Sequence, residues 1–181
     1  MRAPPRFASQ KQPRILRFFS TCVNKSLLRD AIVAQLRAEL ALQTRAEWLA
    51  RDEATNEESR AENKYDTRGQ EAAYLAEGQA RIAAEIEESI AQYSALTLPE
   101  FSAGTAIALG ALVELVGPAK GTWYFLGPRA GGIELRVADR DVLVVTPSSP
   151  LGRQLLGKRV GDTMASPGRT SGSRSRIATL A

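Results

Sequence analysis

The stretch over residues 25–53 reads KSLLRDAIVAQLRAELALQTRAEWLARDE. It contains neither proline nor glycine, and residues with high helix propensity dominate it. Its large aliphatic residues recur mostly at spacings of four, as on one broad helix face. They are Leu28, Ile32, Leu36, Leu40, Leu42 and Leu49. The stretch therefore predicts one long amphipathic helix.

A second long helix is predicted from about Asn63 to Tyr93, despite Gly69 and Gly78. Its stripe at 3.6 residues per turn is narrow and consists of Leu75, Gln79, Ile82, Ile86, Ile90 and Tyr93. Two such helices joined by a polar segment can bury both stripes in an antiparallel hairpin. At about 1.5 Å per residue each arm is on the order of 40 Å long. We expect a rod formed by residues 23–96.

The segment between the two helices, residues 52–66, is the most acidic part of the chain. Its acids outnumber Arg60 and Lys64, and they are Asp52, Glu53, Glu57, Glu58, Glu62 and Asp66. A charged loop is ordinarily just solvated. This one lies at the far end of a rod, which could carry it into a narrow space.

The composition changes after Ser94, and we place a domain boundary near residue 97. Short β-prone runs follow between glycine and proline turns, at residues 112–116, 122–126, 133–137 and 142–145. They predict a meander of antiparallel strands. Residues 127–132, GPRAGG, are read as a hairpin turn, because the strand, loop and helix order of a phosphate-binding loop is missing.

A short helix is predicted over Ser149–Leu156, with a serine cap, Pro150 in the first turn and Gly157 as its stop. Its leucines would cover one face of the sheet, and they are Leu151, Leu155 and Leu156. Trp123, Tyr124 and Phe125 are consecutive, so they cannot all face the same side of a strand. We expect two of them in the core.

The charged residues are unevenly distributed along the 181 residues. Residues 1–22 and 169–181 contain arginine or lysine but no acid, so the body between them is net acidic although the whole chain carries a net charge of +4. We expect residues 1–22 to be a disordered extension or to precede a true start at Val23; a transit peptide is the alternative. Residues 169–181 form a Ser/Arg-rich tail or the last strand.

Histidine is absent and Cys22 is the single cysteine. This composition excludes Ser-His and Cys-His nucleophiles, a disulfide framework and a multi-cysteine zinc site. No apolar run approaches the ~18 residues of a transmembrane helix. We expect a cytoplasmic protein that is not an ordinary hydrolase.

Two segments resemble a known family. Residues 146–162, TPSSPLGRQLLGKRVGD, closely resemble the C-terminal signature of the GreA/GreB transcription elongation factors. Residues 61–65, AENKY, resemble the Glu-Asn-x-x-Tyr region at that family's coiled-coil tip, with Tyr65 one position early. The order of the two segments also agrees, and the resemblance covers about residues 25–168.

The resemblance implies an α+β protein, with an N-terminal antiparallel coiled-coil hairpin followed by a small FKBP-like antiparallel β domain, residues 97–168, with one short helix. That domain would dock at the secondary channel of bacterial RNA polymerase, and the rod would enter the channel. The docking residues carried over from the signature are Ser149, Pro150, Leu151, Gly152, Gly157, Lys158, Gly161 and Asp162. In the family, two tip acids help hold a Mg²⁺ ion in the polymerase active centre, where a metal-bound water cleaves backtracked RNA.

The family's tip acids stand three residues apart, and Glu62 occupies the second place. The first place is Ser59, whose neutral hydroxyl cannot replace a carboxylate as a strong metal ligand. Glu58 is adjacent, and either Glu58 or Asp66 shares a helix face with Glu62 at a spacing of four. Glu62 and Glu58 are therefore the candidate catalytic and metal-binding residues, with Asp66 as an alternative. Glu58 could equally be a solvated surface residue.

The expected protein is an accessory factor and not itself an enzyme: a monomer that binds RNA polymerase and meets RNA and DNA only within the transcription complex. No cofactor would be bound tightly, and Mg²⁺ would be shared with the polymerase. Ser59 favours a second possibility, a channel-entering regulator or inhibitor without cleavage activity. Two other classes stay open, an FKBP-like peptidyl-prolyl isomerase and a purely structural coiled coil.

Overall fold

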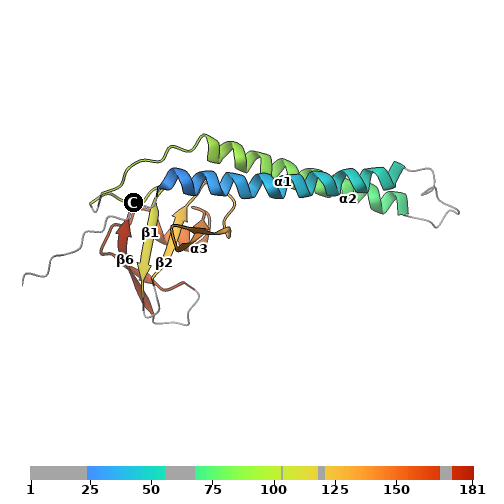
Figure 1. Ribbon diagram of the computed structural model, residues 1–181. Coiled ribbons are helices and arrows are strands. Elements are labelled where there is room, and N and C mark those ends of the chain that lie inside the picture. The colour runs from blue at the N-terminus through green and yellow to red at the C-terminus, as the bar shows by residue number, and fades with distance from the viewer. Residues whose placement is uncertain (1–23, 56–67, 103, 118–120, 168–172) are drawn as a thin grey trace, which may run out of the picture.

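The computed structural model describes residues 24–55, 68–102, 104–117, 121–167 and 173–181 (Figure 1). The helices are α1 (Lys25–Thr55), α2 (Arg68–Ser94) and α3 (Pro150–Leu155). The strands are β1 (Leu112–Val116), β2 (Thr122–Leu126), β3 (Glu134–Val137), β4 (Arg140–Val145), β5 (Thr163–Ala165) and β6 (Arg174–Leu180). The predicted fold class is confirmed: a helical hairpin precedes a small, mainly antiparallel sheet with one short helix.

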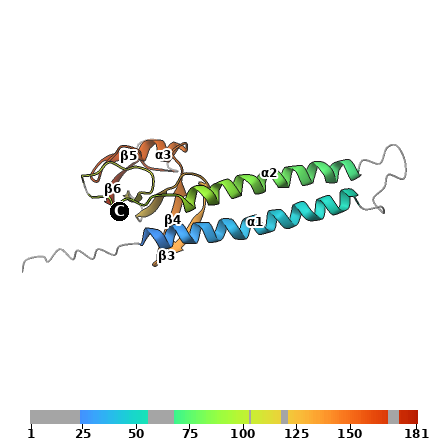
Figure 2. The ribbon, with the colours of Figure 1, turned by 90° about the horizontal axis from the view of Figure 1, so that it is seen from above.

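The hairpin is a rod that reaches well beyond the sheet (Figures 1 and 2). Asn24 caps α1, because its side-chain oxygen accepts a hydrogen bond of 3.0 Å from the Ser26 amide. Close to the sheet, the large apolar residues of the two helices meet as predicted. Leu28, Ile32, Leu36, Ile86 and Tyr93 are all buried there.

The distal half of the hairpin is built differently from the prediction. Leu42 is 69% exposed, Leu49 52% and Leu75 55%, so the expectation that they line the seam was wrong. Small residues take their place in the seam, since Ala50 and Ala76 are buried. Two helices that meet through alanines lie too close together to admit leucines between them. Leu49 and Leu75 each neighbour a buried alanine in sequence, so their side chains point about a quarter turn away from the seam and remain exposed.

The six strands form one sheet in the order β3-β4-β2-β1-β6-β5. All neighbouring pairs are antiparallel except β2 and β4, which run parallel. The simple meander was therefore wrong at this point, and residues 127–132 are not a hairpin turn. They connect β2 to β3, and β4 then returns between these two strands. The tight turn lies instead at Ala138 and Asp139, both with positive φ, as a two-residue hairpin loop requires.

The last strand lies in the Ser/Arg-rich tail. β6 pairs with β1 on one side and β5 on the other, so residues 174–180 belong to the interior of the sheet. Alternation places Ser175 and Ile177 in the buried layer while Arg174 and Arg176 are exposed.

Both faces of the sheet are buried, each by a different part of the chain. Phe125, Val142 and Val144 pack with the base of the hairpin, whereas Tyr124 and Leu126 pack with the short helix α3 through Leu155. The expectation for the aromatic triplet is confirmed, because Tyr124 and Phe125 are buried on opposite faces. Leu156, expected to cover the sheet, is 40% exposed because α3 ends one residue before it.

Candidate functional site

The junction between rod and sheet is built around Tyr93 in the last turn of α2. Its side chain is fully buried, and its hydroxyl donates a hydrogen bond of 2.8 Å to the backbone carbonyl of Arg129. Gly127 leaves room for this ring, since a Cβ there would lie 2.1 Å from the tyrosine oxygen. Desolvation by burial raises the pKa of the Tyr93 phenol well above its usual range. The phenol therefore acts as a neutral hydrogen-bond donor.

Two further contacts tie the rod to the sheet domain, one to the loop after β2 and one to the chain between α2 and β1. Arg129 forms an ion pair of 2.6 Å with Glu88 of α2, and the Lys25 ammonium at the start of α1 donates to the Pro99 carbonyl. The ion pair is solvent-exposed and contributes little by itself. Most of the cohesion comes from the buried cluster that α1, α2 and the sheet share. The sheet thus fixes the direction in which the rod points.

The far end of the rod is defined by the last residue of α1, Thr55, and the first of α2, Arg68. The candidate acids Glu58, Glu62 and Asp66, together with Ser59, lie outside the described residues. The described part of the chain contains no group of three or more potential metal ligands.

The C-terminal end of α1, which leads to the tip, has acidic residues where a helix prefers cations. Asp52 and Glu53 are exposed in the last turns of α1, and the last turn has no basic residue. A carboxylate near a helix C-terminus is disfavoured by the helix dipole. These acids therefore do not stabilise α1 locally.

The signature segment, residues 146–162, follows β4 and comprises the short helix α3 with the turns on either side of it. The Ser149 hydroxyl accepts from the Gly152 amide at 3.0 Å and donates to the Thr146 carbonyl at 2.8 Å. Gly152 has no space for a side chain, because a Cβ would lie 1.9 Å from that same carbonyl oxygen. Asp162 accepts a hydrogen bond from the Arg159 amide at 2.9 Å. Each of these residues has a role in the local fold.

The remaining docking candidates divide into turn residues and surface residues. Gly157 and Gly161 adopt φ of 78° and 96°, which favours glycine. Leu151 is partly buried against the core cluster that lies between α3 and the sheet. Pro150 is exposed and Lys158 is half-buried. Direct contact of these residues with a polymerase stays a prediction.

The outward surface of α3 contains residues that the sequence reasoning missed. Arg153, Gln154 and Leu156 are exposed there, between the turn residues of the segment. Helical spacing within the segment could have identified them, since the buried positions Gly152 and Leu155 leave these three on the other side. Arg153 also donates to the Ser148 carbonyl at 2.8 Å, so its guanidinium lies over the helix start.

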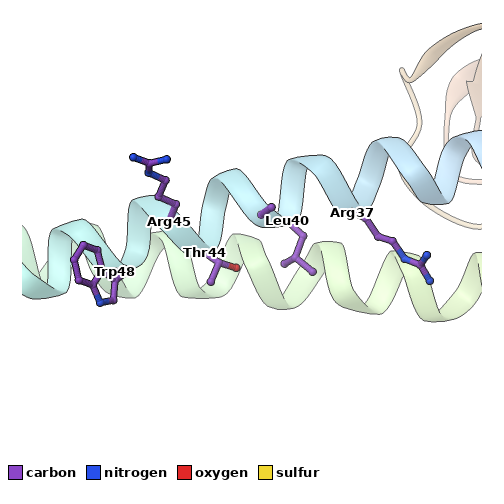
Figure 3. A pocket seen from close by; sticks show the side chains of 6 residues that line it. Arg37, Leu40, Thr44, Arg45 and Trp48 are labelled. Atoms are coloured by element: carbon purple, nitrogen blue, oxygen red, sulfur yellow. The ribbon is translucent and has the colours of Figure 1, made fainter.

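The outer side of α1 has a shallow, mostly apolar groove. Arg37, Leu40, Ala41, Thr44, Arg45 and Trp48 line it. Figure 3 shows Trp48, Thr44, Leu40 and Arg37 following one another along the helix, with Arg45 on its other edge. Its two arginines contrast with the acidic tip.

In the described part of the sheet domain, the aromatic side chains do not converge on a pocket. Phe125 and Trp123 belong to the cluster under the hairpin, while Tyr124 and Phe101 belong to the cluster under α3. The sheet separates the two pairs. This arrangement does not favour the isomerase alternative, which needs aromatic side chains around one cavity.

No helix in the described ranges has the length and hydropathy needed to cross a bilayer. The chain matches no family model and no curated protein. Among solved structures it is similar to Gfh1 of Thermus aquaticus, with 24% identity over 86% of this chain and 93% of that chain and a TM-score of 0.35. It is also similar to GreA factor homolog 1 (Gfh1) of Thermus thermophilus, with 22% identity, coverage of 82% and 94%, and a TM-score of 0.31. A structure of the transcription factor Gfh1 has 23% identity, coverage of 82% and 92%, and a TM-score of 0.33.

Proposed function

We propose that this protein is an accessory factor of bacterial RNA polymerase that docks through its sheet domain and inserts the hairpin into the secondary channel. The observation that carries the proposal is the rod itself. Its base is held by the buried Tyr93 junction, and its far end leads into the acid-rich residues 56–67. A rigid arm with an acidic end can deliver carboxylates to a site inside a larger enzyme.

The two ends of the molecule would have different roles, docking at one end and metal binding at the other. The turn and helix of residues 146–162 present Arg153 and Leu156 on a surface remote from the tip, which suits docking at the channel entrance. The tip would supply Glu62, with Glu58 as its partner, to a Mg²⁺ ion that the polymerase already holds. Carboxylate oxygens are the hard ligands that Mg²⁺ prefers, and a bound Mg²⁺ makes its water a better nucleophile.

A regulator that enters the channel without stimulating cleavage is the second candidate. Ser59 favours it, because the family's first acidic place is then neutral. Both candidates share the docking step and differ only in what happens at the tip. Purified polymerase stalled in a backtracked complex with Mg²⁺ distinguishes them, since only a cleavage factor releases short 3′ RNA fragments.

For the cleavage function we predict that Glu62→Ala leaves polymerase affinity within a few-fold but removes most fragment release, because a metal ligand is lost. Glu58→Ala should give a partial loss, and Glu53→Ala, which lies in α1 before the tip, almost none. Ser59→Asp should raise cleavage by restoring the family's spacing. Fragment release from the backtracked complex is the measurement.

Two results would contradict this mechanism. One is cleavage that survives when Glu58 and Glu62 are both neutralised. The other is a Ser59→Asp variant with no change in fragment release. If the wild-type protein binds but only slows transcription, it is a regulator of the polymerase without cleavage activity.

A further inference from the structure

The distal half of the hairpin carries four large aliphatic side chains on its surface. Leu42 and Leu49 of α1 are 69% and 52% exposed, and Leu75 and Ile82 of α2 are 55% and 38% exposed. Each pair is seven residues apart, which is the spacing of one side of a helix in a coiled coil. We call these four residues the distal stripe.

Both halves of the distal stripe lie on the same flank of the hairpin. In α1, spacings of four and three place Gln35, Glu39, Leu42, Ala46, Leu49 and Glu53 in one row. In α2 the same spacings give Glu71, Leu75, Gly78, Ile82, Glu85 and Ser89. Gln35 and Glu39 from the first row and Ile82, Glu85 and Ser89 from the second line one groove of about 740 Å³. The two rows therefore border a single channel between the helices.

The sheet domain occupies this groove near the base of the rod and leaves it open farther out. Residues 129–134 line the groove together with α1 and α2, and Ala130 and Ile133 pack against the buried cluster there. Beyond this loop the distal stripe continues the same apolar line without cover from the described residues, as its exposure shows. The flank is thus an interface that the protein's own loop fills only in part.

The polar residues of the two rows indicate what could cover the rest. The charged members on which the charge match depends are Glu39, Glu53 and Glu85, and neither row contains lysine or arginine. A second copy placed on the same stripe would bring these carboxylates together, which is unfavourable. A helix with basic residues beside an apolar face would match both the charge and the spacing. Ala46 and Gly78 leave space for close approach, and no atom lies within 4 Å of a Cβ built at Gly78.

We propose that the distal stripe receives a basic amphipathic helix of the polymerase, which packs lengthwise into the groove as a third helix. This inference rests on the proposed function and adds to it a lateral contact along the rod, separate from both the sheet domain and the acidic tip. The helix would place apolar residues at i, i+3 or i+4, and i+7 between the rows and its lysines or arginines against the glutamates. Docking buries leucines that water otherwise surrounds.

The test compares affinities for purified core RNA polymerase. The double variant Leu42→Ser/Leu49→Ser should weaken binding on the order of tenfold to a hundredfold, because buried aliphatic contact is lost. Gly78→Trp should weaken it similarly by filling the groove, and a Cβ at this position meets no atom within 4 Å. The matched control is Tyr74→Ser, since Tyr74 is 74% exposed in the same part of α2 but outside its row. Tyr74→Ser should bind as the wild type does.

A photo-crosslinking amino acid at position 49 identifies the occupant directly. Linkage to a helical segment of the polymerase that is rich in lysine and arginine supports the proposal, with position 74 as the control. Linkage to a second copy or to residues 1–22 of the same chain would overturn it, as would unchanged affinity of the Leu42/Leu49 variant and of Gly78→Trp. If the wild-type protein fails to bind polymerase, the proposed function itself is wrong. If the wild type binds and the variants in the distal stripe bind equally well, only this inference is refuted.

Discussion

Replacing Gly152 by alanine should destabilise the sheet domain by about 3 kcal/mol, the upper end of what overpacking usually costs. The added methyl would lie 1.9 Å from the Thr146 carbonyl oxygen and 2.7 Å from its carbon, both backbone atoms. It would also lie 3.0 Å from the Ser149 hydroxyl oxygen that caps α3. Relief requires the turn between β4 and α3 to open and the cap to break. Urea unfolding followed by tryptophan fluorescence measures the change, since Trp123 lies in β2.

Gly78→Ala is the matched control, because it makes the same substitution in a helix where space is open. It should raise stability by about 0.5–1 kcal/mol, the gain from replacing a helical glycine. A Gly152→Ala protein with normal stability would contradict the steric argument. If that protein also lost polymerase binding, Gly152 would be a direct docking residue and not a structural one.

Truncating Tyr93 to alanine should cost about 3–5 kcal/mol, as for other large buried aromatic residues. The ring fills the space between α2, Gly127 and the sheet, and its hydroxyl satisfies the Arg129 carbonyl. Its loss removes packing where the end of α2 meets the sheet. We expect a lower midpoint in thermal unfolding and faster proteolysis in the chain between α2 and β1.

Tyr93→Phe separates the hydrogen bond from the packing, and it should cost about 1–2 kcal/mol because the carbonyl loses its donor. The pKa of the phenol is higher in the folded protein than in the unfolded chain. Its contribution to stability is therefore complete below about pH 10, the ordinary tyrosine pKa, and declines as the pH rises above it. Tyr93→Phe should lack this part of the alkaline loss. Equal alkaline destabilisation of both proteins would show that Tyr93 is not its source.

Local patterns predicted most of the elements. The strands over residues 112–116 and 122–126 have the predicted bounds, and α3 begins beside its predicted serine cap. Apolar alternation and turn residues act over a few residues, so they can be read without knowing the fold. The same holds for the two long helices and for the leucines near their base.

Strand order and the distal seam could not be read in this way. The parallel pairing of β2 with β4 depends on which strand reaches a vacant edge, and no residue within β2 encodes it. Whether Leu42 and Leu49 enter the seam depends on the rotation of two helices against each other, and the alanines of both helices set that rotation together.

The candidate site likewise has features that the sequence predicts and features that depend on tertiary packing. The acidic residues between the two helices and the signature of residues 146–162 could be recognised in the sequence, because each is contiguous in the chain. The roles of Gly152 and Ser149 in the turn at α3, of Tyr93 in joining the rod to the sheet, and the outward position of the distal stripe became visible only in the folded chain. These properties arise from contacts between segments far apart in the chain, and such contacts are fixed only when the whole core packs.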